Sequence, residues 1–189
     1  MSEPVAAAGE PVATLRSYDP GTIAFHWVTA VLVLVLFASM RIRPLLPRDW
    51  HLGRPLESFH VSIGILFAAV LVLRLVWRLV RGRRLPAGAG VAEWAARSVH
   101  FALYLLLVLQ VGLGFGLRWF QGEGLSFFGL FSLPDIVERN RGLAHSLEGL
   151  HDWVAWALII VAGGHALAAL VHHYVVRDRV LTRMLPAAG

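Results

Sequence analysis

The sequence has 189 residues, of which 57% are hydrophobic and only 15% are charged. Soluble domains carry about a quarter charged residues, so this composition argues against an ordinary soluble enzyme. The absence of cysteine excludes thiolate-held iron–sulfur clusters, zinc ribbons and thioether-attached haem, which leaves nine His as the nitrogen donors for any metal. The net charge of +5 accompanies long apolar runs, which favours a membrane protein with basic loop ends over a nucleic-acid-binding protein.

The first twenty residues are rich in Ala, Pro and Glu, and we expect residues 1–20 to be disordered. Four apolar stretches follow, each close to the ~20 residues that cross ~30 Å of hydrocarbon. They cover approximately residues 23–40, 59–80, 98–117 and 153–171. Backbone that crosses a bilayer has to satisfy its own hydrogen bonds, so these stretches must be helices. The sequence therefore predicts an all-α protein, an integral membrane four-helix bundle that forms one domain over residues 21–186.

The basic residues predict the orientation of this bundle in the membrane. Arginine is frequent at the end of the second stretch, in the loop that follows it and after the fourth stretch, and the positive-inside rule makes that side cytoplasmic, together with both termini. These residues are Arg74, Arg78, Arg81, Arg83, Arg84, Arg177, Arg179 and Arg183. The first loop is also basic, through Arg41, Arg43, Arg48 and Arg54, so the pattern is not uniform.

The third loop, about residues 119–149, mixes five aromatic residues with Gly and charges. Two interpretations remain open for it. Such a segment can lie in the interface over the mouth of the bundle, or its aromatic residues can form a belt at the headgroups. His51 and His145 fall in predicted loops, where we expect them to face solvent.

Four histidines lie at matched depths in the predicted helices. His26 and His165 fall toward the inner side, and His60 and His151 toward the outer side. His151 and His165 are fourteen residues apart, which returns a helix to within about 40° of the same face after ~21 Å. A single histidine within a membrane helix is more often a packing residue, but ionisable groups there default to a functional role. Two facing pairs at two depths predict two haems, each held by two imidazoles in the bundle core.

Residues around these histidines suit a large flat cofactor. Gly64 lies one turn from His60, and small residues surround His165. Arg74 and Arg78 form part of a basic stripe at the inner end of the second helix. Haem propionates need such cationic partners, although arginines at this position also extend to anionic lipid. Glycines also serve simple helix packing, and both interpretations stand.

Three motifs stand out: Phe25-His26-Trp27, the stretch Phe59-His60-Val61-Ser62-Ile63-Gly64, and the segment from Gly163 through His165 to His172-His173-Tyr174. They resemble the bacterial cytochrome b561 family, and most of all a member of it that passes electrons from superoxide to ubiquinone. The resemblance covers approximately residues 17–186. It implies a four-helix protein of the bacterial inner membrane with two haem b groups, whose ligands fall on His26, His60, His151 and His165.

The resemblance also implies a reaction. Superoxide, or another one-electron donor, would reduce the outer haem, and ubiquinone would accept electrons near His172, which matches the family position associated with the quinone. An imidazole there can hydrogen-bond a quinone carbonyl and deliver a proton. His100, at the inner start of the third helix, is a second candidate for the same pocket. The basic first loop would attract superoxide electrostatically.

Two other functions remain compatible with the sequence. One is a cytochrome b electron-relay subunit of a larger membrane dehydrogenase or hydrogenase, reduced by a docked protein. The other is a non-redox membrane protein whose histidines bind no haem, a role that a reduced-minus-oxidised absorption spectrum distinguishes from both cytochromes.

Overall fold

A computed structural model describes residues 17–81 and 90–185. Its long helices are α1 (Pro20–Ile42), α2 (Gly53–Val80), α3 (Val91–Gln121) and α4 (Arg141–Val171). All four are long and apolar enough to cross a membrane, so the predicted all-α membrane fold is confirmed. Most of the segment expected to be disordered, residues 1–16, lies outside the described residues, as do Arg83, Arg84 and residue 186.

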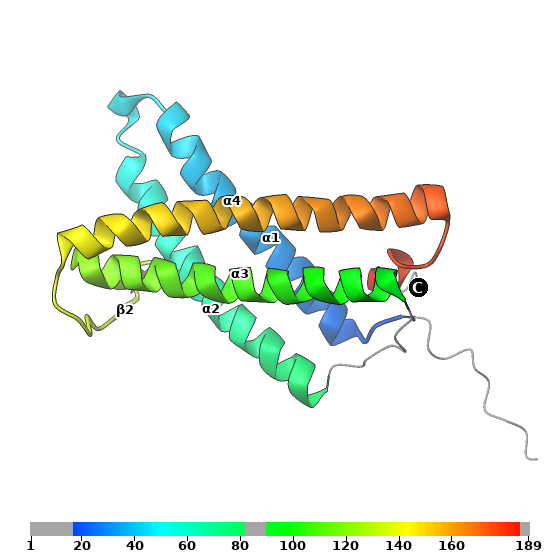
Figure 1. Ribbon diagram of the computed structural model, residues 1–189. Helices are drawn as coiled ribbons and strands as arrows, with labels where there is room; N and C mark the ends of the chain where they lie inside the picture. Colours follow the sequence, from blue (N-terminus) through cyan, green and yellow to red (C-terminus); the bar gives the residue numbers. More distant parts are fainter. Residues whose placement is uncertain (1–16, 82–89, 186–189) are drawn as a thin grey trace, which may run out of the picture.

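The helices form two antiparallel pairs, and the pair α1 and α2 crosses the pair α3 and α4 obliquely (Figure 1). One end of the bundle carries the connections from α1 to α2 and from α3 to α4, and we call it the hairpin end. At the opposite end, which we call the termini end, α1 begins and α4 finishes.

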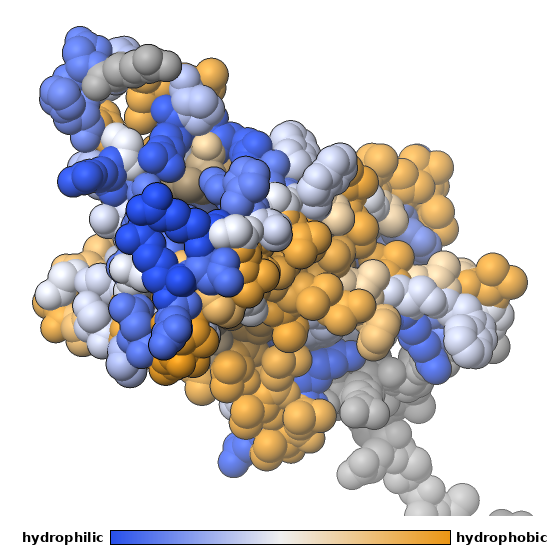
Figure 2. Space-filling model, turned by 60° about the vertical axis from the view of Figure 1, so that its left-hand side comes forward, coloured by the Kyte–Doolittle hydropathy of each residue, from blue (hydrophilic) through white to orange (hydrophobic). Residues whose placement is uncertain are grey.

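A small apolar cluster lies at the centre of the bundle, where the two helix pairs cross. It consists of Phe67, Leu71, Leu107 and Leu158, all buried. Many other large apolar side chains are exposed, among them Leu34, Leu73, Phe101 and Ile160. Figure 2 shows a broad hydrophobic surface over the middle of the face in view, with polar side chains gathered around the hairpin end. An apolar surface of this extent is stable in lipid and not in water.

The connection between α3 and α4 differs from the predicted loop of residues 119–149. α3 continues to Gln121 and α4 already begins at Arg141, because a helix extends past the membrane wherever its polar residues still favour helical structure. His145 therefore lies on α4 and not in a loop, although its side chain is exposed. A short hairpin of β1 (Leu125–Phe127) and β2 (Phe131–Leu133) occupies the middle of this connection.

The hairpin is attached to α2 by a buried serine. The Ser62 hydroxyl accepts a hydrogen bond from the backbone N–H of Phe128 at 2.9 Å and lies 3.3 Å from the carbonyl oxygen of Ser126. Leu125 is almost completely buried, and the rings of Phe59 and Phe128 are 6.5 Å apart. These contacts hold the hairpin against α2, and β1 also contacts α3.

Hydrogen bonds to Asp19 join α1 to α2 at the termini end. Asp19 caps α1 by accepting from the backbone N–H of Thr22 at 2.9 Å, and it also accepts from the indole N–H of Trp77 at 2.9 Å. A Cβ atom on Gly21 would lie 2.4 Å from the Trp77 ring, so only glycine permits this approach of α1 to α2. The ends of the two helices are thereby fixed side by side.

Candidate functional site

The four histidines predicted to pair meet in two pairs. The ring centroids of His60 on α2 and His151 on α4 are 6.3 Å apart. Those of His26 on α1 and His165 on α4 are also 6.3 Å apart. Each pair therefore joins α4 to one helix of the other antiparallel pair, the first toward the hairpin end and the second toward the termini end.

This spacing fits a metal between two imidazoles. A metal in that position lies about 2.0 to 2.1 Å from each ligating nitrogen, which places the two ring centres about 6 Å apart. Among the described residues no three His, Cys, Asp or Glu side chains converge as a bare metal ion requires. Haem iron needs only two axial ligands from the protein, so the two pairs suit haem and not a free ion.

A cavity of about 550 Å³ surrounds the pair at the hairpin end. Its lining includes His60, His151, Gly64, Gly114 and Phe115, with side chains from all four helices. A Cβ on Gly64 would meet nothing within 4 Å, whereas one on Gly114 would lie 3.0 Å from the His151 ring. Gly64 thus leaves open space near His60, and Gly114 lets the backbone of α3 lie close to the His151 ring. A flat group of haem size needs such space.

Hydrogen bonds orient the ring of His60 for metal binding. Its Nδ1 lies 3.1 Å from the carbonyl oxygen of Leu36 and 3.0 Å from the hydroxyl of Ser39. A carbonyl oxygen only accepts, so Nδ1 must carry the proton, and Nε2 has the free lone pair that a metal requires. Metal-binding histidines usually donate their second N–H in this way.

In the part of the chain that the structure describes, three buried polar atoms on residues lining this cavity have no hydrogen-bond partner. They are Nδ1 of His151, Oε1 of Gln121 and Oε1 of Gln110. The amide nitrogen of Gln110 lies 3.1 Å from Nε2 of His151. Buried polar groups are normally paired, and an unpaired one calls for an explanation. The unpaired atoms of His151 and Gln110 are explained if a bound group contacts His151 and displaces the Gln110 amide.

His100 lies beside the second pair. Its ring centroid is 5.3 Å from that of His165, closer than the ring of His26. No ring contact or hydrogen bond joins His100 to His172 within the part of the chain that the structure describes. The structure therefore places His100 next to the predicted haem pair. No contact between described residues supports its predicted place in a quinone pocket with His172.

Arg74 and Arg78 gather around one tyrosine on α3. Their guanidinium groups lie 5.2 and 5.5 Å from the centre of the Tyr104 ring. Arg74 also donates to the Tyr104 hydroxyl at 3.1 Å and to the carbonyl oxygen of Phe25 at 3.4 Å. Arg74 is consequently turned into the bundle next to His26, whereas Arg78 is exposed.

His172 has a partner that the sequence did not reveal. Its Nδ1 lies 2.5 Å from a carboxylate oxygen of Asp178. Residues His172–Val176 form a π-helical turn, and Arg177 then adopts a positive φ of 59°. Six residues along an α-helix point to a different face, so only this change of backbone conformation brings the two side chains together.

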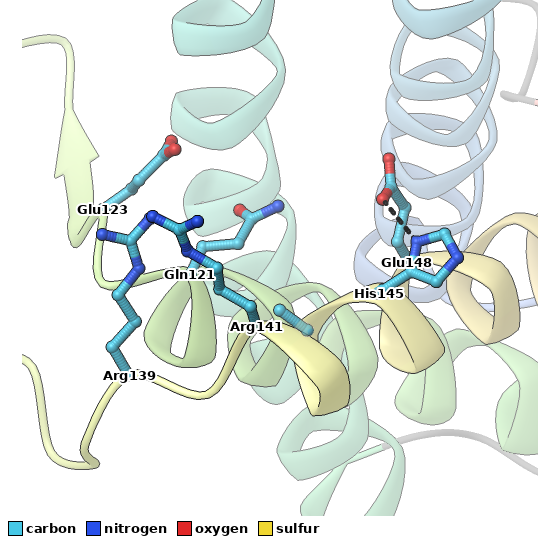
Figure 3. A pocket seen from close by; sticks show the side chains of 7 residues that line it. Gln121, Glu123, Arg139, Arg141, His145 and Glu148 are labelled. Atoms are coloured by element: carbon cyan, nitrogen blue, oxygen red, sulfur yellow. Dashed lines mark ion pairs between the residues drawn. The ribbon is translucent and has the colours of Figure 1, made fainter.

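A second, polar pocket of about 180 Å³ opens at the hairpin end (Figure 3). Its lining shares Gln121, His145 and Glu148 with the large cavity, so the two are adjacent. Figure 3 shows the guanidinium groups of Arg139 and Arg141 on the same side of the pocket as Gln121. Among the described residues no carboxylate lies within ion-pair distance of these two arginines.

The basic residues of the first loop are more neutralised than the sequence suggested. Arg41 forms an ion pair with Asp152, and Arg43 lies 3.4 Å from Glu57. Glu57 also pairs with Arg118 on α3 at 2.8 Å. The side chain of Arg48 lies outside the described part of the chain.

Comparisons with known proteins agree with this architecture. The family described as prokaryotic cytochrome b561 matches residues 17–187. Cytochrome b561 homolog 2 of Escherichia coli (strain K12) is 34% identical over 91% of this chain and 93% of its own length. The probable superoxide oxidase CybB of Yersinia pestis is 31% identical over 90% of this chain and 97% of its own length. The chain therefore belongs to the prokaryotic cytochrome b561 family of membrane b-type cytochromes, which transfer electrons.

Proposed function

We propose that this protein is a di-haem b oxidoreductase that passes electrons from superoxide to ubiquinone. The balanced reaction takes two superoxide anions, one ubiquinone and two protons to two molecules of oxygen and one ubiquinol. One observation carries the proposal: two histidine pairs with the same 6.3 Å spacing lie toward opposite ends of one membrane-spanning bundle.

In this proposal the chain holds the cofactors at two depths. His60 and His151 bind one haem b, His26 and His165 bind the other, and the bound haems supply reversible one-electron chemistry between the two ends. Arg74 and Arg78 provide positive charge next to the second pair, where a haem propionate needs a cationic partner. The helical rise over the fourteen residues of α4 between His151 and His165 sets the separation at about 21 Å.

The proposal places the electron donor at the hairpin end, outside the cytoplasmic membrane. The distribution of arginine supports this orientation, with both termini in the cytoplasm. The cavity around His60 and His151 adjoins a polar pocket whose charged lining is Arg139, Arg141, Glu123 and Glu148. No described carboxylate forms an ion pair with either arginine, so both can attract a small anion. The similarity to a probable superoxide oxidase supports superoxide as that anion.

Ubiquinone would accept the electrons at the termini end, inside the lipid. His172 follows His165 by two helical turns, about 10 Å further along the same face. Its imidazole can hydrogen-bond a quinone carbonyl and deliver a proton when the quinone is reduced.

The proposed reaction is tested on one purified sample. We expect a reduced-minus-oxidised spectrum with the α-band of haem b, and superoxide consumption that requires ubiquinone and yields ubiquinol in a ratio of two to one. A spectrum without that band contradicts any cytochrome function. Haem bands without superoxide-dependent ubiquinol would instead favour reduction by a docked protein partner.

Electrostatic attraction at the polar pocket gives a further prediction. Replacing both Arg139 and Arg141 by glutamine is expected to slow reduction of the haems by superoxide about threefold or more at low salt and to weaken its salt dependence, since fewer cations then attract the anion. Stopped-flow absorbance at several ionic strengths measures both effects. Arg97→Gln, an exposed change toward the opposite end of α3, is the control and should behave as the parent. Equal rates and salt slopes in all three proteins would show that the pocket does not guide superoxide.

A further inference from the structure

The contact between His172 and Asp178 is built by the backbone that joins them. The amide N–H of Asp178 donates to the carbonyl oxygen of His172 at 3.1 Å, and the amide N–H of Arg177 donates to the same oxygen. The π-helical turn and the left-handed Arg177 carry the chain back toward His172. Single π-helical turns often occur at functional sites, and a non-glycine residue with positive φ has a conformational cost that other interactions must offset.

The carboxylate of Asp178 is fixed at both oxygens. One oxygen accepts from the backbone N–H of Val180 at 2.9 Å, and the other lies 2.5 Å from Nδ1 of His172. The Val180 N–H, together with the imidazole of His172 and the charge of Arg183, lowers the pKa of Asp178 below its usual value. Asp178 is therefore ionised and can only accept, so Nδ1 of His172 carries the proton.

The segment that carries Asp178 is itself attached to the bundle. The indole N–H of Trp27 on α1 donates to the carbonyl oxygen of Met184 at 2.8 Å. The backbone N–H of Tyr18 donates to the carbonyl oxygen of Arg183 at 3.1 Å. Figure 1 shows this segment folding back from the end of α4 toward the start of α1. Asp178 thus belongs to a structured corner of the molecule.

We propose that Asp178 is the positioning residue for quinone reduction, an inference that rests on the proposed function. By accepting a hydrogen bond from Nδ1–H, the Asp178 carboxylate fixes the orientation of the His172 ring and stabilises the imidazolium, whose Nε2–H donates to the quinone carbonyl. As two electrons from superoxide reduce the quinone, the protonated imidazole gives its Nε2 proton to the quinone oxygen. The imidazole keeps its Nδ1 proton, and a second proton from water completes the ubiquinol. After the ubiquinol leaves, water returns a proton to Nε2 of the partly exposed His172 side chain.

Two substitutions separate the hydrogen bond from the charge. Asp178→Ala removes both, and we expect re-oxidation of the pre-reduced haems by a short-chain ubiquinone to slow about tenfold or more, with a higher KM. Asp178→Asn keeps an oxygen that accepts from Nδ1 but removes the negative charge that stabilises the imidazolium. We expect it to retain the parent KM and lose mainly kcat.

A spectroscopic measurement follows the contact independently of turnover. In protein labelled with ¹⁵N-histidine and reduced to the diamagnetic state, the Nδ1 proton of His172 is identified by its loss in His172→Ala. We expect this resonance far downfield in the parent and shifted upfield in Asp178→Ala. Asp135→Ala, a matched change in the exposed connection before α4, should leave the resonance and re-oxidation unchanged.

The outcomes distinguish this inference from the function on which it rests. A parent-like resonance in Asp178→Ala, or a shifted resonance with unchanged re-oxidation and KM, overturns the positioning role alone. Haems that no ubiquinone re-oxidises, even in the parent, overturn the proposed function and this inference together. Full haem bands in both variants establish that their effects do not arise from misfolding.

Discussion

Replacing His60 or His151 by alanine is expected to remove one and the same haem, and replacing His26 or His165 to remove the other. In the proposed function each pair would supply both protein ligands of one haem iron, so the loss of either imidazole would leave that iron with an incomplete set of ligands. We expect each variant to lose about half of its haem per chain, and the two groups of variants to differ in which component disappears from a redox titration. Pyridine haemochrome assays and potentiometric spectra measure the two quantities.

Controls for this prediction lie on the same helices. His145→Ala changes an exposed histidine on α4 and should retain the full haem content. His100→Ala is the more demanding control, because its ring is closer to His165 than that of His26 is. We expect His100→Ala to retain both haems. Loss of the same haem from His100→Ala and His165→Ala, but not from His26→Ala, would reassign the second pair.

Gly114→Val is expected to remove the haem at the hairpin end while the other haem remains. A Cβ atom at this position would lie 3.0 Å from Cε1 of His151, and the larger side chain displaces the imidazole from the cavity. Overpacking of a close-packed site typically costs about 1–3 kcal/mol, which is enough to disturb a ligand and not enough to unfold the bundle. Haem content per chain and the redox titration again report the result.

Gly112→Val is the control that shows whether haem loss requires a side chain next to His151 or follows from any valine in place of a glycine on α3. Gly112 lies on the same helix, and a Cβ atom there would meet nothing within 4 Å. We therefore expect Gly112→Val to keep both haems. If the two variants lose haem equally, the glycines of α3 act through helix packing and not through access to His151.

The histidine pairs could be predicted from the sequence because they depend on regular helix geometry alone. The length of each apolar stretch predicted the membrane-spanning segments, and the direction of each segment predicted the depths of His26 and His60. The number of residues per helical turn placed His151 and His165 on the same face of one helix. None of these steps requires a side-chain contact. The same geometry explains why the four-helix bundle was predicted correctly.

Features that depend on irregular backbone were not predictable in this way. The length of an apolar stretch matches the thickness of the membrane and not the full length of a helix, so hydropathy gave no sign that residues 141–150 are helical. Asp178 meets His172 only through a π-helical turn and a residue with positive φ, neither of which has a clear sequence signal. The ion pairs of Arg41 and Arg43 join distant segments and likewise required the structure.

The presence of α4 in both histidine pairs has a consequence for biosynthesis. α1 and α2 enter the membrane first, yet neither His26 nor His60 has its partner until the last helix is in place. In the proposed function, haem held by a pair would connect α4 to the antiparallel pair of α1 and α2. A chain truncated before α4 would contain neither complete pair, so haem loading would mark a chain whose final transmembrane helix has been inserted.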